Sequence, residues 1–152
     1  MASDSTRNRE ELREKNTGRL LLKAHRAFNE LAIEKLRVMG HTSLSVAHAA
    51  VLPHIDSEGT RSSELARRAG MTKQSMSRLV NDLVAEGYLR SEADPTDARA
   101  ALIAFTAKGL RYLNDAHQVK TAIELHYAKV LGTRKLSELR ASLEKLIAIR
   151  NE

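Results

Sequence analysis

The sequence predicts a mostly α-helical protein with one small β-hairpin, and three observations support this fold class. Apolar residues recur at helical spacing through most of the chain. Gly70 separates two of these helical segments by a tight turn. Two short runs of alternating apolar residues flank residues 94–99, Asp-Pro-Thr-Asp-Ala-Arg, which is the pattern of a hairpin with a charged tip. The 152 residues are enough for one domain with a core of its own.

Composition limits the classes of function. The formal net charge of +6 suits a polyanionic partner, although many basic proteins bind no nucleic acid. The chain has no cysteine, which excludes disulfides and thiolate zinc sites. No apolar run approaches the length of about 20 residues that spans a bilayer. The N-terminus is polar and lacks an apolar signal region, so we expect a cytoplasmic protein without a membrane partner.

The first long helix is predicted from Thr17 to Met39, and Gly40 ends it. Residues 1–16 ahead of it are polar and carry a run of charges, which predicts a flexible tail. The alternative for this tail is a basic arm that contacts a nucleic-acid backbone. The broad apolar face of the helix consists of Leu20, Leu21, Ala24, Ala27, Phe28, Leu31 and Leu36.

A shorter helix is predicted to follow. Ser45 has the position of an N-cap, with Leu44 as its hydrophobic staple, and starts a helix that runs to about Ile55. Pro53 lacks a backbone donor, so it should kink or shorten the last turn. Residues 56–59, Asp-Ser-Glu-Gly, then form a turn.

Two helices joined by a tight turn are predicted next. The first spans Ser63–Ala69, and Gly70 lies where the chain must reverse, because glycine enters the left-handed region without steric cost. Thr72 is placed to cap the second helix, Lys73–Glu86, by accepting an amide hydrogen bond from its first turn. The apolar residues that should hold this second helix to the domain are Met76, Leu79, Val80 and Leu83.

The opposite side of this second helix is polar and predicts contact with DNA. Its residues donate or accept the hydrogen bonds that base edges and phosphates offer, although an ordinary solvated helix face would have the same composition. Arg61 is a candidate phosphate contact, and Ser63 and Thr72 are assigned to the same surface. Arg67 and Arg68 either contact phosphates or face water. The residues assigned to the DNA-contacting side are Lys73, Gln74, Ser75, Ser77 and Arg78.

Two further helices are predicted after the hairpin. Thr106 should cap a long helix that runs to about Leu131 and stops at Gly132, and a last helix spans Thr133–Arg150. The apolar side of the first is formed by Leu110, Leu113, Ala116, Ile123, Tyr127 and Val130. The second carries a stripe of Leu136, Leu139, Leu143, Leu146 and Ile147.

These terminal helices are too long to be covered by the segment between them. An apolar stripe needs a partner, and a second copy of the chain is the simplest one. A two-fold dimer also presents two helices to two DNA half-sites about one helical turn apart. We therefore expect a homodimer that binds palindromic double-stranded DNA.

Residues 94–109, DPTDARAALIAFTAKG, resemble the wing of MarR-family winged helix-turn-helix regulators, an Asp-x-Arg sequence followed by Leu-Thr-x-x-Gly. Phe105 replaces the leucine of that pattern and keeps its apolar character. The resemblance extends from Thr17 to Ala148. It implies a tail at 1–16, one domain at 17–150 with a winged helix-turn-helix head at about 58–106, and dimerisation helices at about 17–39 and 107–150. It also implies a transcriptional repressor that a small-molecule effector releases from its operator.

The same resemblance assigns Arg99 to the minor groove of DNA, with Asp97 orienting it. A guanidinium suits the negative potential of a narrow groove, and a carboxylate can fix its orientation. The alternative is a plain turn whose Asp97 bonds its own backbone. We favour the DNA-contacting interpretation, because a charged hairpin tip is suited to the minor groove.

The sequence carries no signature of an enzyme and implies no cofactor. It lacks HExxH, GxSxG and glycine-rich phosphate-loop motifs. Some family members bind zinc, and His41, His48 and His54 lie close together in the sequence, but without cysteine we predict no metal site. Two alternatives to a DNA-binding regulator stay open, a dimeric interaction protein that keeps the fold without binding DNA and a metal-responsive regulator.

Overall fold

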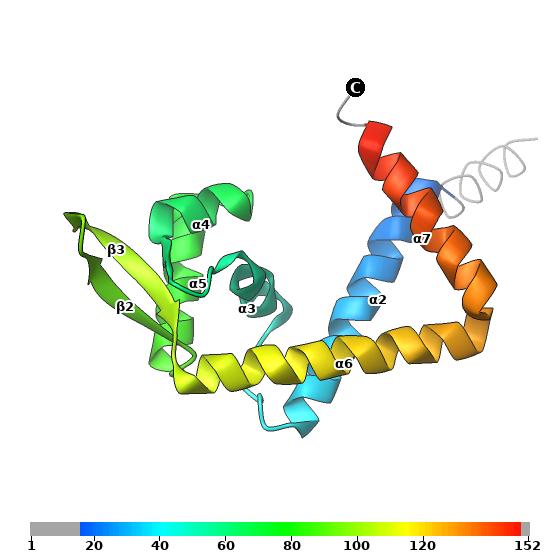
Figure 1. Ribbon diagram of the computed structural model, residues 1–152, viewed down its shortest axis with the longest axis horizontal. Coiled ribbons are helices and arrows are strands. Elements are labelled where there is room, and N and C mark those ends of the chain that lie inside the picture. The colour runs from blue at the N-terminus through cyan, green and yellow to red at the C-terminus, as the bar shows by residue number, and fades with distance from the viewer. Residues whose placement is uncertain (1–15, 150–152) are drawn as a thin grey trace, which may run out of the picture.

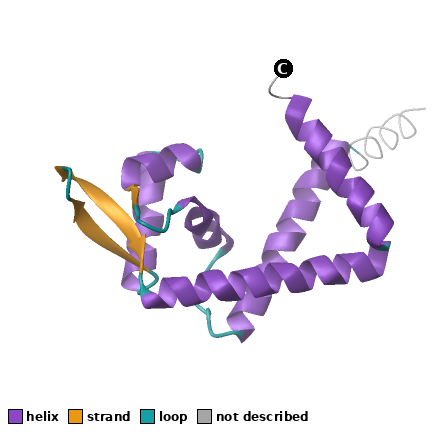
Figure 2. Cartoon of the chain, viewed as in Figure 1, coloured by secondary structure: helices purple, strands orange, loops and turns teal. Residues whose placement is uncertain are grey.

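The structure is a computed structural model, and it describes residues 16–149; the tail predicted at the N-terminus lies almost entirely outside them. Six helices and a small antiparallel sheet make up this part of the chain (Figures 1 and 2). The helices are α2 (Thr17–Val38), α3 (Val46–Val51), α4 (Ser62–Arg68), α5 (Lys73–Ala85), α6 (Ala107–Leu131) and α7 (Thr133–Ala148), with a 3-10 turn η1 (Leu52–His54). The strands are β1 (Thr60–Arg61), β2 (Leu89–Asp94) and β3 (Asp97–Phe105). The mostly α-helical fold with a hairpin is therefore confirmed.

The elements form two parts. The head contains α3, α4, α5 and the sheet, while α2, α6 and α7 form a frame of long helices that we call the body (Figure 1). Helix α6 begins beside the hairpin and runs along one side of the molecule, where α2 crosses it and contacts it. None of the described helices is long and apolar enough to cross a membrane.

The predicted starts and ends of the helices are confirmed where local chemistry determines them. Gly40 adopts a φ of 98°, and the His41 amide donates to the Leu36 carbonyl over 3.0 Å, which ends α2. The Ser45 side chain caps α3 and shares a capping box with His48. Pro53 lies in η1, so α3 is shortened as predicted.

The helix-turn-helix is also confirmed. Gly70 turns the chain with a φ of 62°, and the Thr72 hydroxyl accepts from the Ser75 amide over 3.1 Å to cap α5. Of the four apolar residues predicted to hold α5, Met76, Val80 and Leu83 are buried and Leu79 is partly buried. The polar side of α5 therefore faces away from the core.

The hairpin is the pair β2–β3, and a third strand that was not predicted lies beside it. Strand β1 pairs with β3 through Thr60 opposite Ile103 and Arg61 opposite Leu102, which gives the strand order β1-β3-β2. Two residues are too few to show the alternation by which a strand is detected. The register of β2 shifts between Ala93 and Asp94, next to the hairpin turn.

Helix α6 is fixed to the head at its first turn. The Thr106 hydroxyl accepts from the Gly109 amide over 3.1 Å and donates to the Gly87 carbonyl over 2.6 Å. Gly109 packs against the backbone of Tyr88 so closely that a Cβ atom there would lie 2.2 Å from the Tyr88 carbonyl oxygen. This contact requires glycine and sets the direction in which α6 leaves the head.

The body helices bury only part of their apolar surface within one chain. The interior side of α6 consists of Tyr112, Ala116, Val119 and Ile123, whereas Leu110 and Leu113, predicted on its apolar side, are exposed. The predicted apolar face of α2 is likewise exposed in its N-terminal half. On α7 only Leu136 is buried. The exposed large apolar residues of these helices include Leu20, Leu21, Leu22, Leu110, Leu125, Val130, Leu139, Leu146 and Ile147.

Candidate nucleic-acid interface

The polar residues predicted for DNA contact lie together at the start of α5. The buried Met76 and Val80 mark the side of this helix that faces the core, and residues 73–75 and 77–78 are exposed. The Thr72 hydroxyl donates to the Ser75 hydroxyl over 2.9 Å, so these two side chains are held in the cap. Ser63 is exposed near the start of α4. The exposed residues of this surface are Lys73, Gln74, Ser75, Ser77 and Arg78.

The hairpin β2–β3 projects from the head, beyond α4 and α5 (Figure 1). Its tip holds Asp97, which is exposed, and Arg99 follows two residues later in β3. A projecting hairpin beside an exposed polar helix is the arrangement that places one element in the major groove and the other over the minor groove. The predicted pairing of Asp97 with Arg99 stays a prediction.

A buried carboxylate that was not among the predicted site residues organises the turn of the hairpin. Asp94 is only 7% exposed. Its Oδ1 accepts from the Thr96 amide over 2.8 Å and from the Thr96 hydroxyl over 2.6 Å. These Thr96 bonds, together with Arg61, hold the pKa of Asp94 at about 2. Asp-Pro-Thr is a pattern in which an aspartate bonds the amide two residues on, so this signal was present in the sequence.

Arg61 is the second partner of Asp94. Its Nε donates to Oδ2 of Asp94 over 2.6 Å, and its Nη2 donates to the Thr96 hydroxyl over 3.1 Å. The side chain of Arg61 is 45% exposed, so the ion pair lies at the edge of the head. The role of Arg61 as a phosphate contact stays a prediction. In the structure the same guanidinium binds the hairpin turn through Asp94 and Thr96.

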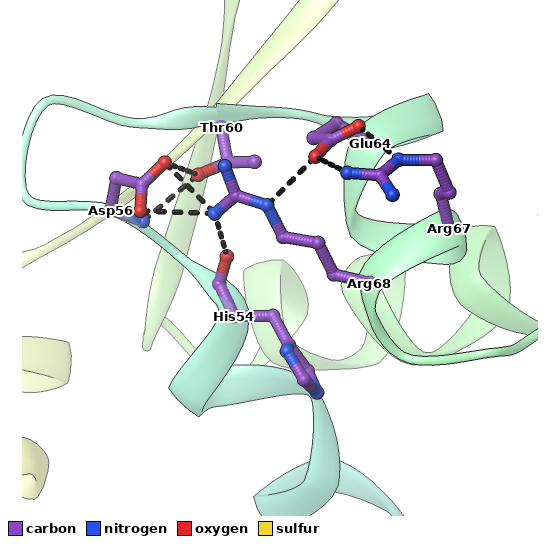
Figure 3. A network of polar contacts seen from close by, with 6 residues as sticks. All are labelled: His54, Asp56, Thr60, Glu64, Arg67 and Arg68. Atoms are coloured by element: carbon purple, nitrogen blue, oxygen red, sulfur yellow. Dashed lines mark hydrogen bonds and ion pairs between the residues drawn. The ribbon is translucent and has the colours of Figure 1, made fainter. Parts of the chain in front are cut away.

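Arg67 and Arg68 belong to a network of polar contacts that ties α4 to the segment before β1 (Figure 3). Arg68 donates to Asp56 over 2.9 Å, to the His54 carbonyl over 3.0 Å and to Glu64 over 2.9 Å. Arg67 and then Arg68 lower the pKa of Glu64 to about 2. The two arginines are therefore engaged with carboxylates on the head itself.

The three histidines that are close in the sequence do not converge. His41 is buried, with Nδ1 2.9 Å from the Tyr88 hydroxyl and Nε2 3.0 Å from Oδ2 of Asp115. His48 belongs to the cap of α3, and the carbonyl of His54 accepts from Arg68. Within residues 16–149 no group of three or more His, Asp or Glu is placed to hold a metal ion. The side chains of His41 and His48 therefore have structural roles.

The lowered pKa of Asp94 predicts acid sensitivity of the hairpin. Because the folded-state pKa of about 2 lies below the ordinary value of 3.8, the ionised carboxylate stabilises the folded state above about pH 4. That stabilisation is lost as the pH falls toward 2. Asp94→Asn does not titrate, so the difference in thermal midpoint between the parent and this variant should shrink from about pH 6 to about pH 3.

Thermal unfolding followed by circular dichroism at a series of pH values checks this expectation. A difference in midpoint that stays constant over the whole range would contradict it. Glu58→Gln, at an exposed position of the turn before β1, is the control for loss of an ordinary carboxylate.

Comparison with known proteins agrees with this geometry. A model of the MarR family matches residues 42–100, from the segment before α3 into the hairpin. A transcriptional regulator from Thermotoga maritima is 25% identical with a TM-score of 0.61, and the match covers 88% of this chain and 93% of the other. Wild-type apo MarR from E. coli is 22% identical with a TM-score of 0.72, over 86% of this chain and 96% of the other.

A MarR transcriptional regulator from Methanosarcina mazei Go1 has the same fold, with 20% identity and a TM-score of 0.72 over 86% of this chain and 93% of the other. No curated protein matches the chain at a significant level of sequence similarity. The family model covers the helix-turn-helix and the hairpin turn, and the structural matches extend over the body helices as well. Residues 42–100 therefore match the MarR family, and the described chain has the fold of winged helix-turn-helix regulators of that family.

Proposed function

We propose that this protein is a dimeric regulator that binds a specific palindromic DNA sequence. The observation that carries the proposal is the exposed polar start of α5 beside a projecting hairpin. Lys73, Gln74, Ser75, Ser77 and Arg78 would contact base edges and phosphates in the major groove, with Ser63 and Thr72 at the backbone. Arg99, oriented by Asp97, would contact the adjacent minor groove.

The dimer is proposed on the apolar surface that the body leaves exposed. Leu139 and Leu146 on α7 are 45% and 48% exposed, and they lie seven residues apart on one stripe. A second copy related by a two-fold axis would cover this stripe and the exposed leucines of α2. The same axis would present two α5 helices to two half-sites.

Release by a small molecule is proposed on a cavity between the body and the head. The cavity has a volume of about 270 Å³ and lies between α2, α3 and α6. Its walls are mostly apolar, with Phe28, Ala32 and Val119 among them, and His25 and Lys120 add polar groups to the lining. A small apolar molecule with one hydrogen-bonding or anionic group fits this lining. Such an effector would lower operator affinity in a gel-shift titration and make the protein a ligand-released repressor.

Selection of bound sequences from a random duplex library is the experiment that tests the main proposal. A DNA-binding dimer should enrich a palindrome whose half-sites lie about one helical turn apart. Enrichment of no sequence, together with no binding to nonspecific duplex at low salt, would favour a dimeric interaction protein instead. The measurement separates the two functions without knowledge of the target genes.

Replacing Arg99 by alanine should weaken binding to the selected duplex by about 1–3 kcal/mol, the range for a good DNA contact. The position lies in the projecting hairpin, so the thermal midpoint should stay near that of the parent. Fluorescence anisotropy on the labelled duplex gives the affinity. Arg134→Ala on α7, which removes the same charge far from the head, is the control and should bind like the parent. Equal affinity for the Arg99 variant would exclude the minor-groove contact.

A further inference from the structure

One side chain links the segment before the helix-turn-helix to the turn of the hairpin. Arg61 is the last residue of β1 and directly precedes α4, the first helix of the helix-turn-helix. Its guanidinium reaches the turn between β2 and β3. We propose that Arg61 is a positioning residue that sets the angle of the hairpin relative to α5, an inference that rests on the proposed DNA-binding function.

Two hydrogen bonds link Arg61 to the turn of the hairpin. Nε of Arg61 donates to Oδ2 of Asp94, and Nη2 donates to the hydroxyl of Thr96. Because that hydroxyl gives its own hydrogen to Oδ1 of Asp94, its oxygen is free to accept from Arg61. Both carboxylate oxygens of Asp94 are thus occupied. A planar guanidinium held at two points resists rotation, which a single charged contact does not.

Both ends of the link are anchored. At one end, the hydroxyl of Thr60 accepts from the Asp56 amide over 2.9 Å and donates to the Asp56 carboxylate over 3.2 Å, so the residue before Arg61 is fixed to its own loop. At the other end Asp94 is buried and bonded to Thr96. Strand pairing of β1 with β3 stops at Leu102, well before the tip. The Arg61 side chain therefore extends the attachment of the head to the part of the hairpin that should meet DNA.

This arrangement argues against Arg61 as a plain phosphate contact. Its positive charge is already paired with the Asp94 carboxylate at 2.6 Å, so little of it is left to displace counterions from DNA. A phosphate contact tolerates lysine, which keeps the charge, whereas a two-point link does not. The Arg61→Lys substitution consequently separates the two roles.

The test compares Arg61→Lys with the parent on the selected duplex and on random duplex. As a positioning residue, Arg61 should lose about tenfold affinity for the selected duplex on replacement by lysine, with no change on random duplex and an unchanged salt slope. Protection of the minor groove beside each half-site from hydroxyl radicals should fade, while protection of guanine N7 in the major groove from dimethyl sulfate stays. Asp94→Asn should have the same effect, because it removes the other half of the link.

A double variant of Arg61 and Arg99 tests whether the two residues act through the same contact with DNA. If Arg61 acts through the hairpin, Arg61→Lys should add little to the loss caused by Arg99→Ala. Arg61→Lys with full affinity, or Arg61→Ala with a salt slope lower by about 1 on all sequences, would show a phosphate contact and overturn the inference. Failure of the parent itself to prefer any duplex would overturn the proposed function with it. Circular dichroism spectra like that of the parent at the temperature of the binding assay show that the variants fold.

Discussion

Replacing Leu139 and Leu146 together by aspartate should convert the protein to a monomer and abolish tight binding to a palindrome. Both side chains are about half exposed in one chain, so the folded protomer should tolerate the change. In a dimer that covers α7, each aspartate would bury an unpaired charge at a cost of several kcal/mol. One head alone then keeps half of the DNA contacts. Sedimentation velocity at micromolar concentration measures the assembly, and anisotropy measures the affinity.

The control places the same charges on the opposite side of the helix. Ser137 and Ala141 are exposed, and they lie about half a turn away from Leu139, so Ser137→Asp with Ala141→Asp should leave a dimer. A parent protein that sediments as a monomer yet binds a palindrome tightly would contradict the dimeric mechanism. The exposed leucines of the body would then need another partner.

Replacing Gly109 by alanine should destabilise the fold by about 3 kcal/mol, the upper part of the range for overpacking a core. The added methyl group would meet the Tyr88 carbonyl oxygen at 2.2 Å and the Phe105 ring at 2.8 Å. Backbone cannot move aside as a flexible side chain can, so α6 must shift away from the head. The thermal midpoint, measured at equal protein concentration, should fall by about 10 °C.

Gly18→Ala is the matched control, because Gly18 also lies in a helix and its new methyl group would meet only the Asn16 side chain, at 3.2 Å. Alanine favours helix over glycine by about 1 kcal/mol at an exposed position, so this variant should be as stable as the parent or slightly more so. An equal midpoint for the Gly109 variant would mean that α6 is not held at this contact.

The elements that the sequence predicted correctly are those that one or two local residues determine. Gly70 and Thr72 fix the turn and the start of α5, and Thr106 fixes the start of α6. The glycine of the Leu-Thr-x-x-Gly pattern could be noted from the sequence as well. Its reason, the approach to Tyr88, became visible only in the folded chain.

Features that depend on partners distant in the sequence were missed. Strand β1 has two residues and no pattern of its own, and it exists because β3 lies beside it. The pairing of Arg61 with Asp94 spans 33 positions, so no spacing rule indicates it. The contacts of the buried His41 could not be predicted either, because its partners Tyr88, Tyr112 and Asp115 come from other elements. Apolar faces were misjudged on α6 because periodicity shows which residues are apolar but not which of them a neighbour covers.

The length of α6 has a mechanical consequence. Its 25 residues span about 37 Å at a rise of 1.5 Å per residue. Because Gly109 and Thr106 fix its first turn to the head, a rotation about the far end of the helix should move the head through the full length of the helix. A tilt of about 5° at the far end would swing the head by about 3 Å, since displacement is the product of arm and angle. Adjacent base pairs are about 3.4 Å apart along DNA, so a rotation this small moves α5 by nearly one base pair.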